Sequence, residues 1–261
     1  MHDPAFLATA VEAVIRAGEI HMSKFRSGVR IDKKGAIDLV TEVDMQVEQE
    51  IRAMLAARFP DHDVLAEELG GERSASRYRW VFDPLDGTTN FAHGVPIFCA
   101  ALALEIDGRA EVSAVFDGNR QELFTAERRV GAWLNGEPLR VSHTDTMIDA
   151  MLVTGFPYAV HDDPERYLEV FSAFIRRARA VRRFGSAAVD LCWVAAGRMD
   201  AFWEEALNPW DTMAAALIVE EAGGRVTGMD GGPWVPDDGH ILASNSHLHE
   251  AMLAVISSVR R

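Results

Sequence analysis

The spacing of apolar side chains along the chain predicts alternating helices and strands. Residues 4–25 carry apolar side chains at intervals of three and four, and a second segment with the same spacing begins at Thr41. This period is typical of amphipathic helices, so we expect two helices on one side of a sheet. Short apolar runs at 63–66 and 78–82 predict strands. Each of these runs leads directly into acidic residues.

The segment from Phe98 to Ala126 has the pattern of an antiparallel meander. Its apolar runs are separated by Asp107-Gly108 and by Asp117-Gly118, which are typical residues of tight hairpin turns. These Asp-Gly pairs lie at regular hairpin spacing and lack a following Thr-Thr-Asn. We therefore assign them no chemistry.

The second half of the chain alternates strand and helix patterns. Strands are predicted at 151–156, 181–184, 199–203 and 240–244, and helices at 164–175, 189–195, 209–222 and 248–259. The chain shows no internal repeat, linker or low-complexity segment. We expect one domain over residues 1–261, with two halves of about 1–145 and 150–261.

Composition limits the classes of function. The chain is 48% hydrophobic, and its 26 basic against 40 acidic residues give a net charge of −14, which disfavours nonspecific binding to nucleic acid or to an anionic membrane. Cys99 and Cys192 lie among apolar residues and are expected in the core. Since no stretch approaches the ~20 apolar residues that span a bilayer and no signal peptide is recognisable, we expect a cytoplasmic protein.

The most informative stretch runs from Trp80 to Asn90. A strand pattern ends at Asp83, Pro84 removes a backbone donor, and Asp86 follows in a turn with Gly87. Two such carboxylates favour a hard divalent cation such as Mg²⁺, and N–H groups at a helix start favour phosphate oxygens. The stretch thus predicts metal-dependent phosphoryl chemistry, although Asp-Gly is also a common turn that simply closes a strand.

Further polar residues lie where other predicted elements begin or end. Glu67 follows a strand, Ser186 and Asp211 begin helices, and the pair Glu204-Glu205 follows another strand. Each has an ordinary alternative: a surface acid pair, a helix N-cap for Ser186, or an acid that favours the helix dipole for Asp211. Their common position at element ends favours one shared site.

Five motifs in order resemble the inositol monophosphatase family across nearly the full chain. They are Asp38-Leu39-Val40-Thr41 with Asp44, Glu67-Glu68, Asp83 to Phe91, Gly185-Ser186-Ala187-Ala188, and Pro209-Trp210-Asp211 with Glu221 to Gly224. The resemblance implies a layered α+β fold, the αβαβα sandwich of the inositol monophosphatase and fructose-1,6-bisphosphatase type. It also implies a Mg²⁺-dependent, lithium-sensitive phosphomonoesterase that is usually a homodimer.

The same resemblance implies roles for individual residues. It places two or three Mg²⁺ ions per active site on Glu67, Asp83, the carbonyl of Leu85, Asp86 and Asp211. It gives catalytic roles to Glu67, Thr88 and Asp44, the latter two by orienting and deprotonating the attacking water.

The resemblance also implies the substrate contacts. The N–H groups of Gly87 and Thr88 would hold phosphate, and the alcohol would be contacted by Asp86, Gly185, Ser186, Ala187, Glu204 and Asp211. The expected substrate is myo-inositol monophosphate. Histidinol phosphate, fructose 1,6-bisphosphate and a 3′-phosphonucleotide remain alternatives, because one metal cradle can serve any phosphomonoester. An alternative of another class is an interaction protein that keeps the fold and acts through a macromolecular partner.

Overall fold

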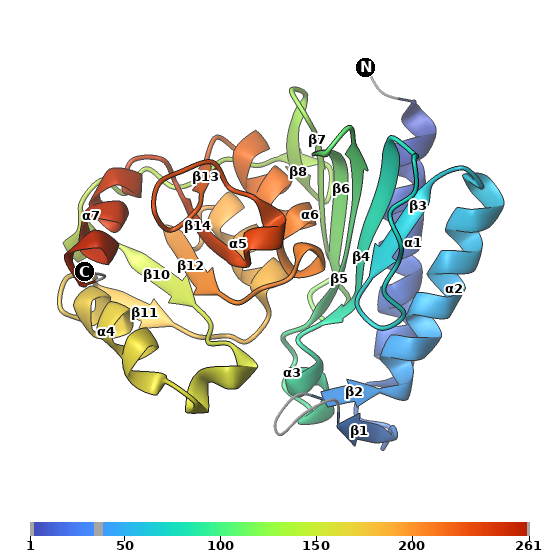
Figure 1. Cartoon of the computed structure of the whole chain (residues 1–261), viewed down its shortest axis with the longest axis horizontal. Coiled ribbons are helices and arrows are strands. Elements are labelled where there is room, and N and C mark those ends of the chain that lie inside the picture. The colour runs from blue at the N-terminus through green and yellow to red at the C-terminus, as the bar shows by residue number, and fades with distance from the viewer. Residues whose placement is uncertain (1–2, 34–38, 260–261) are drawn as a thin grey trace.

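The computed structural model describes residues 3–33 and 39–259 and shows five alternating layers of helix and sheet (Figure 1). The motif residue Asp38 lies outside the described residues. The helices are α1 (Pro4–Lys24), α2 (Glu42–Arg58), α3 (Thr88–Ala92), α4 (Pro164–Ile175), α5 (Ala187–Ala195), α6 (Pro209–Glu221) and α7 (His249–Val259). Short 3₁₀ helices are found at Met147–Asp149, Tyr158–His161 and Pro236–Asp238.

Each half of the chain builds one large sheet. The first has the strand order β3-β4-β5-β6-β7-β8-β9, and its strands are β3 (Asp63–Ala66), β4 (Tyr78–Asp86), β5 (Cys99–Ile106), β6 (Arg109–Asp117), β7 (Glu122–Glu127), β8 (Gly131–Leu134) and β9 (Glu137–Pro138). The second has the order β11-β10-β12-β14-β13, and its strands are β10 (Met151–Thr154), β11 (Ala180–Arg182), β12 (Ala201–Glu205), β13 (Arg225–Thr227) and β14 (His240–Ser244). A separate antiparallel ribbon pairs β1 (Ile31–Lys33) with β2 (Leu39–Thr41).

Alternation along the strands explains the layers, because successive side chains point to opposite faces of a sheet. In β5, Ala101 packs toward the inner helices α5 and α6, whereas Leu102 packs toward α1 and α2. In β12, Phe202 belongs to the same inner core, whereas Trp203 packs toward α4 and α7. The predicted αβαβα sandwich is confirmed, with α1 and α2 together on one face of the first sheet as expected.

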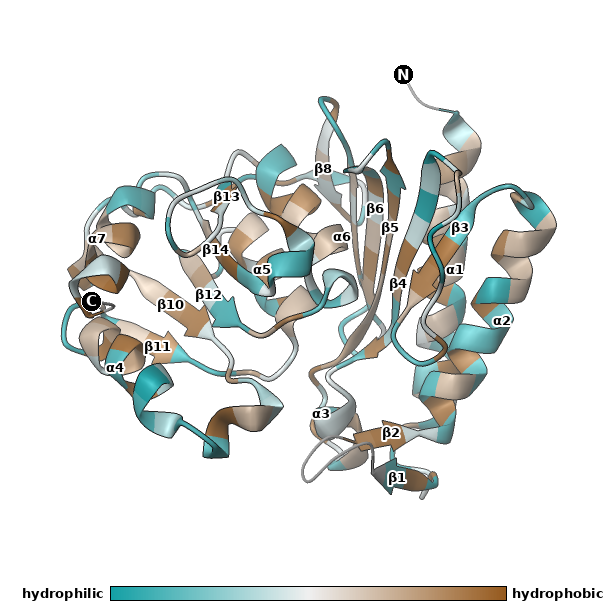
Figure 2. Cartoon of the chain, in the orientation of Figure 1, coloured by the Kyte–Doolittle hydropathy of each residue, from teal (hydrophilic) through white to brown (hydrophobic). Residues whose placement is uncertain are grey.

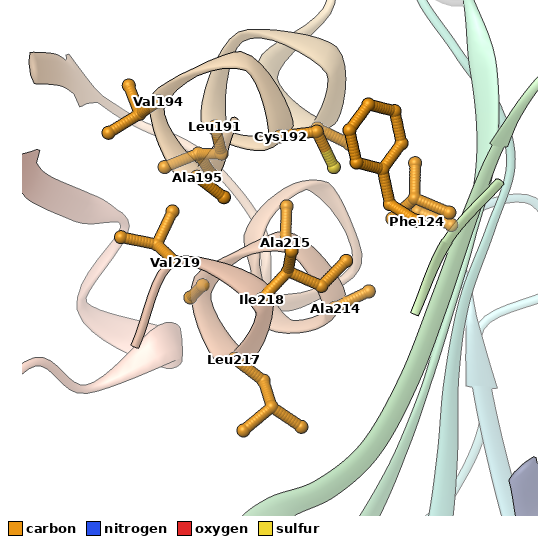
Figure 3. Packing of buried hydrophobic residues seen from close by; sticks show 14 of the residues in the cluster. Phe124, Leu191, Cys192, Val194, Ala195, Ala214, Ala215, Leu217, Ile218 and Val219 are labelled. Atoms are coloured by element: carbon orange, nitrogen blue, oxygen red, sulfur yellow. The ribbon is translucent and has the colours of Figure 1, made fainter. Parts of the chain in front are cut away.

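The inner core is formed where α5 and α6 lie between the two sheets. Figure 3 shows Leu191 and Cys192 of α5 above Ala215 and Ile218 of α6, with Phe124 of β7 beside them. Because α6 is apolar on almost every side, it is buried nearly all around, unlike α2, whose outer face is hydrophilic (Figure 2). Cys99 and Cys192 are both buried free thiols, as expected.

Several predicted boundaries differ from the structure. The strand expected to end at Asp83 continues to Asp86, because its pairing with β5 shifts register between those two residues and resumes at Asp86 opposite Cys99. Pro84 lies within this shift, where a residue without an N–H is tolerated. β11 ends at Arg182 instead of Phe184, and β12 includes both Glu204 and Glu205.

Candidate active site

Parallel pairing brings two acidic strand ends together. β3 lies beside β4 with Ala66 opposite Phe82, so Glu67 and Asp83 follow at the same edge of the sheet. Asp83 is 1% exposed, and its Oδ1 accepts a hydrogen bond of 2.9 Å from the N–H of Leu85. Asp83 and the backbone of Leu85 therefore lie at the same sheet edge as Glu67.

All but one of the expected site residues line a single cleft of about 310 Å³. The residues that the structure brings together there are Glu67, Asp83, Leu85, Asp86, Gly87, Thr88, Gly185, Ser186, Ala187, Glu204 and Asp211. They come from both halves of the chain, so the cleft lies between the first sheet and the elements of the second. The exception is Asp44, which is fully buried beneath it.

Asp44 reaches the cleft only through Thr88. The Thr88 hydroxyl lies 2.9 Å from Asp44 Oδ1 and 2.9 Å from the carbonyl oxygen of Leu85, and its single hydrogen can serve one of them at a time. Asp44 Oδ2 accepts hydrogen bonds from Thr41 Oγ1 at 2.6 Å and from Thr41 N at 2.8 Å, and the second of these is one half of the capping box of α2. The helix start thus fixes the carboxylate that faces Thr88.

Asp86 is held by the second half of the chain. Its Oδ2 accepts hydrogen bonds from Ser186 Oγ at 2.5 Å and from Ala188 N at 2.8 Å. The Ser186 side chain does not cap α5, although it occupies the N-cap position. The N-cap position expected for this serine is thus confirmed, but its hydroxyl orients Asp86 instead of capping the helix.

Asn90 is a further link between the halves that the sequence did not reveal. Its amide nitrogen donates to Ile97 O at 2.8 Å and to Phe184 O at 2.7 Å. Gly87 lies close by with φ +90°, and a Cβ there would be 2.9 Å from Ile97 O. No local spacing indicates the contact with Phe184, because that residue lies 94 positions away in the chain.

Burial, followed by charge repulsion, raises the pKa of acids in the cleft. Burial raises the pKa of Asp83 well above its usual value, and the charges of Glu67, Asp86 and Asp211 raise it further. In the described ranges no three His, Cys, Asp or Glu side chains already stand at the separations of a finished metal shell. The donor chemistry nevertheless fits a hard divalent cation, since four carboxylates that repel one another in a buried cleft require positive charge to be ionised together.

The two adjacent glutamates of β12 have different environments. Burial and the charge of Asp211 raise the pKa of Glu204 to about 8, while the charge of Arg183 opposes that shift. Glu205 pairs with Arg166 at 2.5 Å and does not line the cleft. This agrees with the alternation of a strand, in which neighbouring side chains face opposite ways.

Arg183 is a cleft residue that the sequence analysis missed. Of the lysines and arginines in the described ranges, it alone lines the cleft, and its guanidinium lies 5.7 Å from the centre of the Phe156 ring. Its position two residues before Gly185 was the one available signal.

Comparisons with known proteins agree with this architecture. The model of the inositol monophosphatase family matches residues 3–261. The chain is 45% identical over 260 residues to Nus factor SuhB of Pseudomonas aeruginosa, covering 96% of this chain and 95% of that protein. It is 41% identical over 255 residues to inositol-1-monophosphatase of Synechocystis, covering 97% and 89%.

A solved structure agrees equally well. The extragenic suppressor protein SuhB of Bartonella henselae superposes with a TM-score of 0.92 at 36% identity, over 97% of this chain and 98% of that one. No helix in the described ranges is long and apolar enough to cross a membrane. On its full-length family match and these two relatives, the chain belongs to the inositol monophosphatase family, a family of phosphoric monoester hydrolases that is generally metal-dependent.

Proposed function

We propose that the protein is a Mg²⁺-dependent phosphomonoesterase that hydrolyses myo-inositol monophosphate to inositol and phosphate. The observation that carries the proposal is the convergence of Glu67, Asp83, Asp86 and Asp211 in one cleft with Gly87 and Thr88. The acids supply oxygen ligands for a hard cation, and the N–H groups at the start of α3 have no acceptor within their own helix. Since α3 has only five residues, these individual N–H groups matter more than a helix dipole.

The ligands of the cation follow from the cleft. Glu67, Asp83, the Leu85 carbonyl, Asp86 and Asp211 would hold two or three Mg²⁺ ions. When bound, Mg²⁺ offsets the negative charge of the phosphate and lowers the pKa of a water molecule. Lithium inhibition is part of the proposal, because a small monovalent cation could replace one of these ions on Asp83, Asp86 and Asp211.

Thr88 orients the attacking water in this proposal. Its hydroxyl, held between Asp44 and the Leu85 carbonyl, would accept a proton from the attacking water as its own hydrogen passes to Asp44 Oδ1. Asp44 never reaches the cleft and is a positioning residue that acts through Thr88. Burial raises the pKa of Asp44, and the hydrogen bonds from Thr41 and Thr88 favour its ionised form.

The alcohol end of the substrate faces the second half of the chain. Glu204 is placed to accept hydrogen bonds from neighbouring hydroxyls, with Asp86 and the backbone at Gly185, Ser186 and Ala187 beside it. A substrate that lacks these hydroxyls leaves the buried acid unpaired, which costs about 1–3 kcal/mol. This favours a polyol over histidinol phosphate, a sugar bisphosphate or a 3′-phosphonucleotide.

The proposal includes the setting in which the enzyme works. We propose a homodimer, as the family resemblance implies, and a cytoplasmic location. The net charge of −14 supports the absence of nonspecific nucleic-acid binding.

A substrate panel tests the proposal. The purified protein is assayed on myo-inositol 1-phosphate, histidinol phosphate, fructose 1,6-bisphosphate, a 3′-phosphonucleotide and glycerol 2-phosphate, with Mg²⁺ and after chelation. We expect the highest kcat/KM on inositol phosphate, strict dependence on Mg²⁺ and inhibition by lithium. A higher kcat/KM on any other ester would overturn the substrate, and full activity after chelation would overturn the role of the carboxylates.

A second candidate function is action through a macromolecular partner. It is favoured by the relative from Pseudomonas aeruginosa, 45% identical to this chain, whose name is Nus factor SuhB. The variant Asp83→Asn separates the two functions, because it changes one buried cleft atom and leaves the protein surface intact. A cellular role that survives in this variant would not depend on hydrolysis.

A further inference from the structure

Gly155 lies in the cleft where the end of β10 meets β12. The two strands run parallel with Thr154 opposite Trp203, so Gly155 and Glu204 follow as neighbours on adjacent strands (Figure 1). Thr154 Oγ1 also donates to the Trp203 carbonyl at 2.6 Å, which fixes the two strand ends relative to each other. Gly155 and Glu204 both line the cleft.

The Glu204 carboxylate occupies the space that a side chain at position 155 would need. A Cβ at Gly155 would lie 2.2 Å from each carboxylate oxygen of Glu204 and 2.3 Å from its carboxyl carbon. These separations are far inside van der Waals contact, so any other residue at 155 forces the carboxylate to move. The missing side chain is therefore what allows Glu204 to extend across the end of β10.

Backbone geometry does not explain this glycine. Gly155 is not among the glycines with positive φ, so its conformation is open to any L-residue. The three atoms nearest to such a Cβ all belong to the end of one flexible side chain, that of Glu204. Alanine at 155 should thus be accommodated in the fold by displacement of Glu204.

We propose that Gly155 is a positioning residue for polyol selectivity, since it leaves room for the Glu204 carboxylate to face the substrate hydroxyls. This inference rests on the proposed function of the cleft and adds a residue to it. Glu204 is 8% exposed and lies within the electrostatic influence of Arg183, Asp211 and Asp86, so a displaced carboxylate loses a defined set of neighbours. Selectivity should suffer more than turnover of a simple ester.

The test compares Gly155→Ala with wild type on two substrates. We expect kcat/KM for myo-inositol 1-phosphate to fall about 10-fold or more, while that for glycerol 2-phosphate changes less than about 3-fold. Gly232→Ala is the matched control. Gly232 also lacks positive φ, and a Cβ added there would lie 3.1 Å from a carboxylate oxygen of Asp230. Gly232 does not line the cleft. Equal losses on both substrates in Gly155→Ala would overturn the proposal.

A double variant tests whether the effect of Gly155→Ala depends on the length of the side chain at position 204. Aspartate at 204 is one methylene shorter and withdraws the carboxylate from residue 155, so adding Gly155→Ala to Glu204→Asp should lower the selectivity ratio by less than about 3-fold. A loss as large as that in the wild-type background would contradict the proposed contact.

Crystal structures give a readout that does not depend on the substrate. In Gly155→Ala the Glu204 carboxylate should move by about 1 Å or more from its wild-type position. An unmoved carboxylate would overturn the inference even if inositol phosphate proves to be the substrate. A moved carboxylate in an enzyme without polyol preference would instead overturn the proposed substrate, and with it the selectivity role of Gly155.

Discussion

The two halves of the chain contribute differently to the cleft. The acids of the first half lie on neighbouring strands, with Glu67 just beyond β3 and Asp83 and Asp86 on β4. The expected site residues of the second half come from three separate elements: the start of α5, the end of β12 and the first turn of α6. One sheet edge therefore presents most of the charged groups expected to perform chemistry, with Asp211 of α6 added to them, whereas several element ends surround the expected alcohol.

Buried hydrogen bonds join these two sets of residues. Ser186 and Ala188 of the second half hold Asp86, and Asn90 of the first half holds the carbonyl of Phe184. It follows that a change in the first half should impair all substrates alike, while a change in the second half, apart from the expected metal ligand Asp211, should alter the preference among them. The variants below test that division.

The largest effect is expected for Asp83→Asn. Loss of a carboxylate expected to hold the cation should lower kcat about 10³-fold or more on every ester. Because the folded protein raises the pKa of Asp83, ionising this group opposes folding of the metal-free protein as the pH rises above 3.8. The metal-free variant should therefore be at least as stable as wild type near neutral pH, with a smaller Mg²⁺-induced rise in Tm.

Asp117→Asn is the matched control for this variant. Asp117 is also a buried acid at a strand end, but its Oδ1 accepts from Asn119 N at 2.9 Å and its Oδ2 from Arg120 at 2.7 Å, away from the cleft. The Asp117→Asn variant should have a lower free energy of unfolding and an unchanged kcat. Normal kcat in a folded Asp83→Asn protein would contradict the proposal that the acids of the first half hold the cation.

Thr88→Ala should lower kcat about 10²-fold on both inositol phosphate and glycerol 2-phosphate. The variant keeps the N–H that is expected to bind phosphate and removes only the hydroxyl between Asp44 and Leu85, so KM should change much less. Thr88→Ser retains the hydroxyl and should recover most of the rate. The proposed role would be wrong if KM rose while kcat persisted.

Local patterns predicted the helices, the strands and acids at strand ends because these depend on short-range order, whereas the αβαβα layering was implied by the family resemblance. Apolar spacing determined which faces pack, and the position of Glu67 and Asp83 after apolar runs already indicated a common sheet edge. The register shift that carries β4 on to Asp86 was missed, because it depends on pairing with β5 across a connection that includes α3.

Contacts between the halves were also beyond the sequence. The hydroxyl of Ser186 meets Asp86 across 100 residues, and Asn90 meets Phe184 across 94. Gly155 carried no turn signature, since its reason for being glycine is the Glu204 side chain on a neighbouring strand. Such tertiary contacts leave no periodic trace in the chain.

Glu204→Gln and Glu205→Gln sharpen the comparison within one strand. Glu204→Gln should lower kcat/KM for inositol phosphate about 10-fold, since it weakens contacts to hydroxyls that the simple ester lacks. The kcat/KM for glycerol 2-phosphate should change little. Glu205→Gln should leave that ratio unchanged and only weaken the ion pair with Arg166. A larger change in the ratio at Glu205 would remove Glu204 from the selectivity role.

Of these variants, controls apart, Glu48→Gln should change kcat least, and by the same factor for inositol phosphate and glycerol 2-phosphate. Glu48 is fully buried in α2, and its two oxygens accept from Glu68 N at 2.7 Å and Leu69 N at 2.9 Å, while Arg52 Nε donates to Oε1 at 2.8 Å. Glutamine has one acceptor oxygen, so one of these donors loses its partner and the free energy of unfolding should fall by about 1–3 kcal/mol.

The segment that Glu48 holds begins directly after Glu67, so a looser segment should weaken the placement of that acid. We expect kcat to fall about 3- to 10-fold on inositol phosphate and on glycerol 2-phosphate alike, with a higher Mg²⁺ concentration needed for half-maximal rate. Glu50→Gln on the same helix is the control, because Glu50 pairs with Arg16 at the surface, so this variant should leave both rates unchanged. A change in the ratio between the two substrates would show that this loop of the first half selects among alcohols, and the division between the halves would fail.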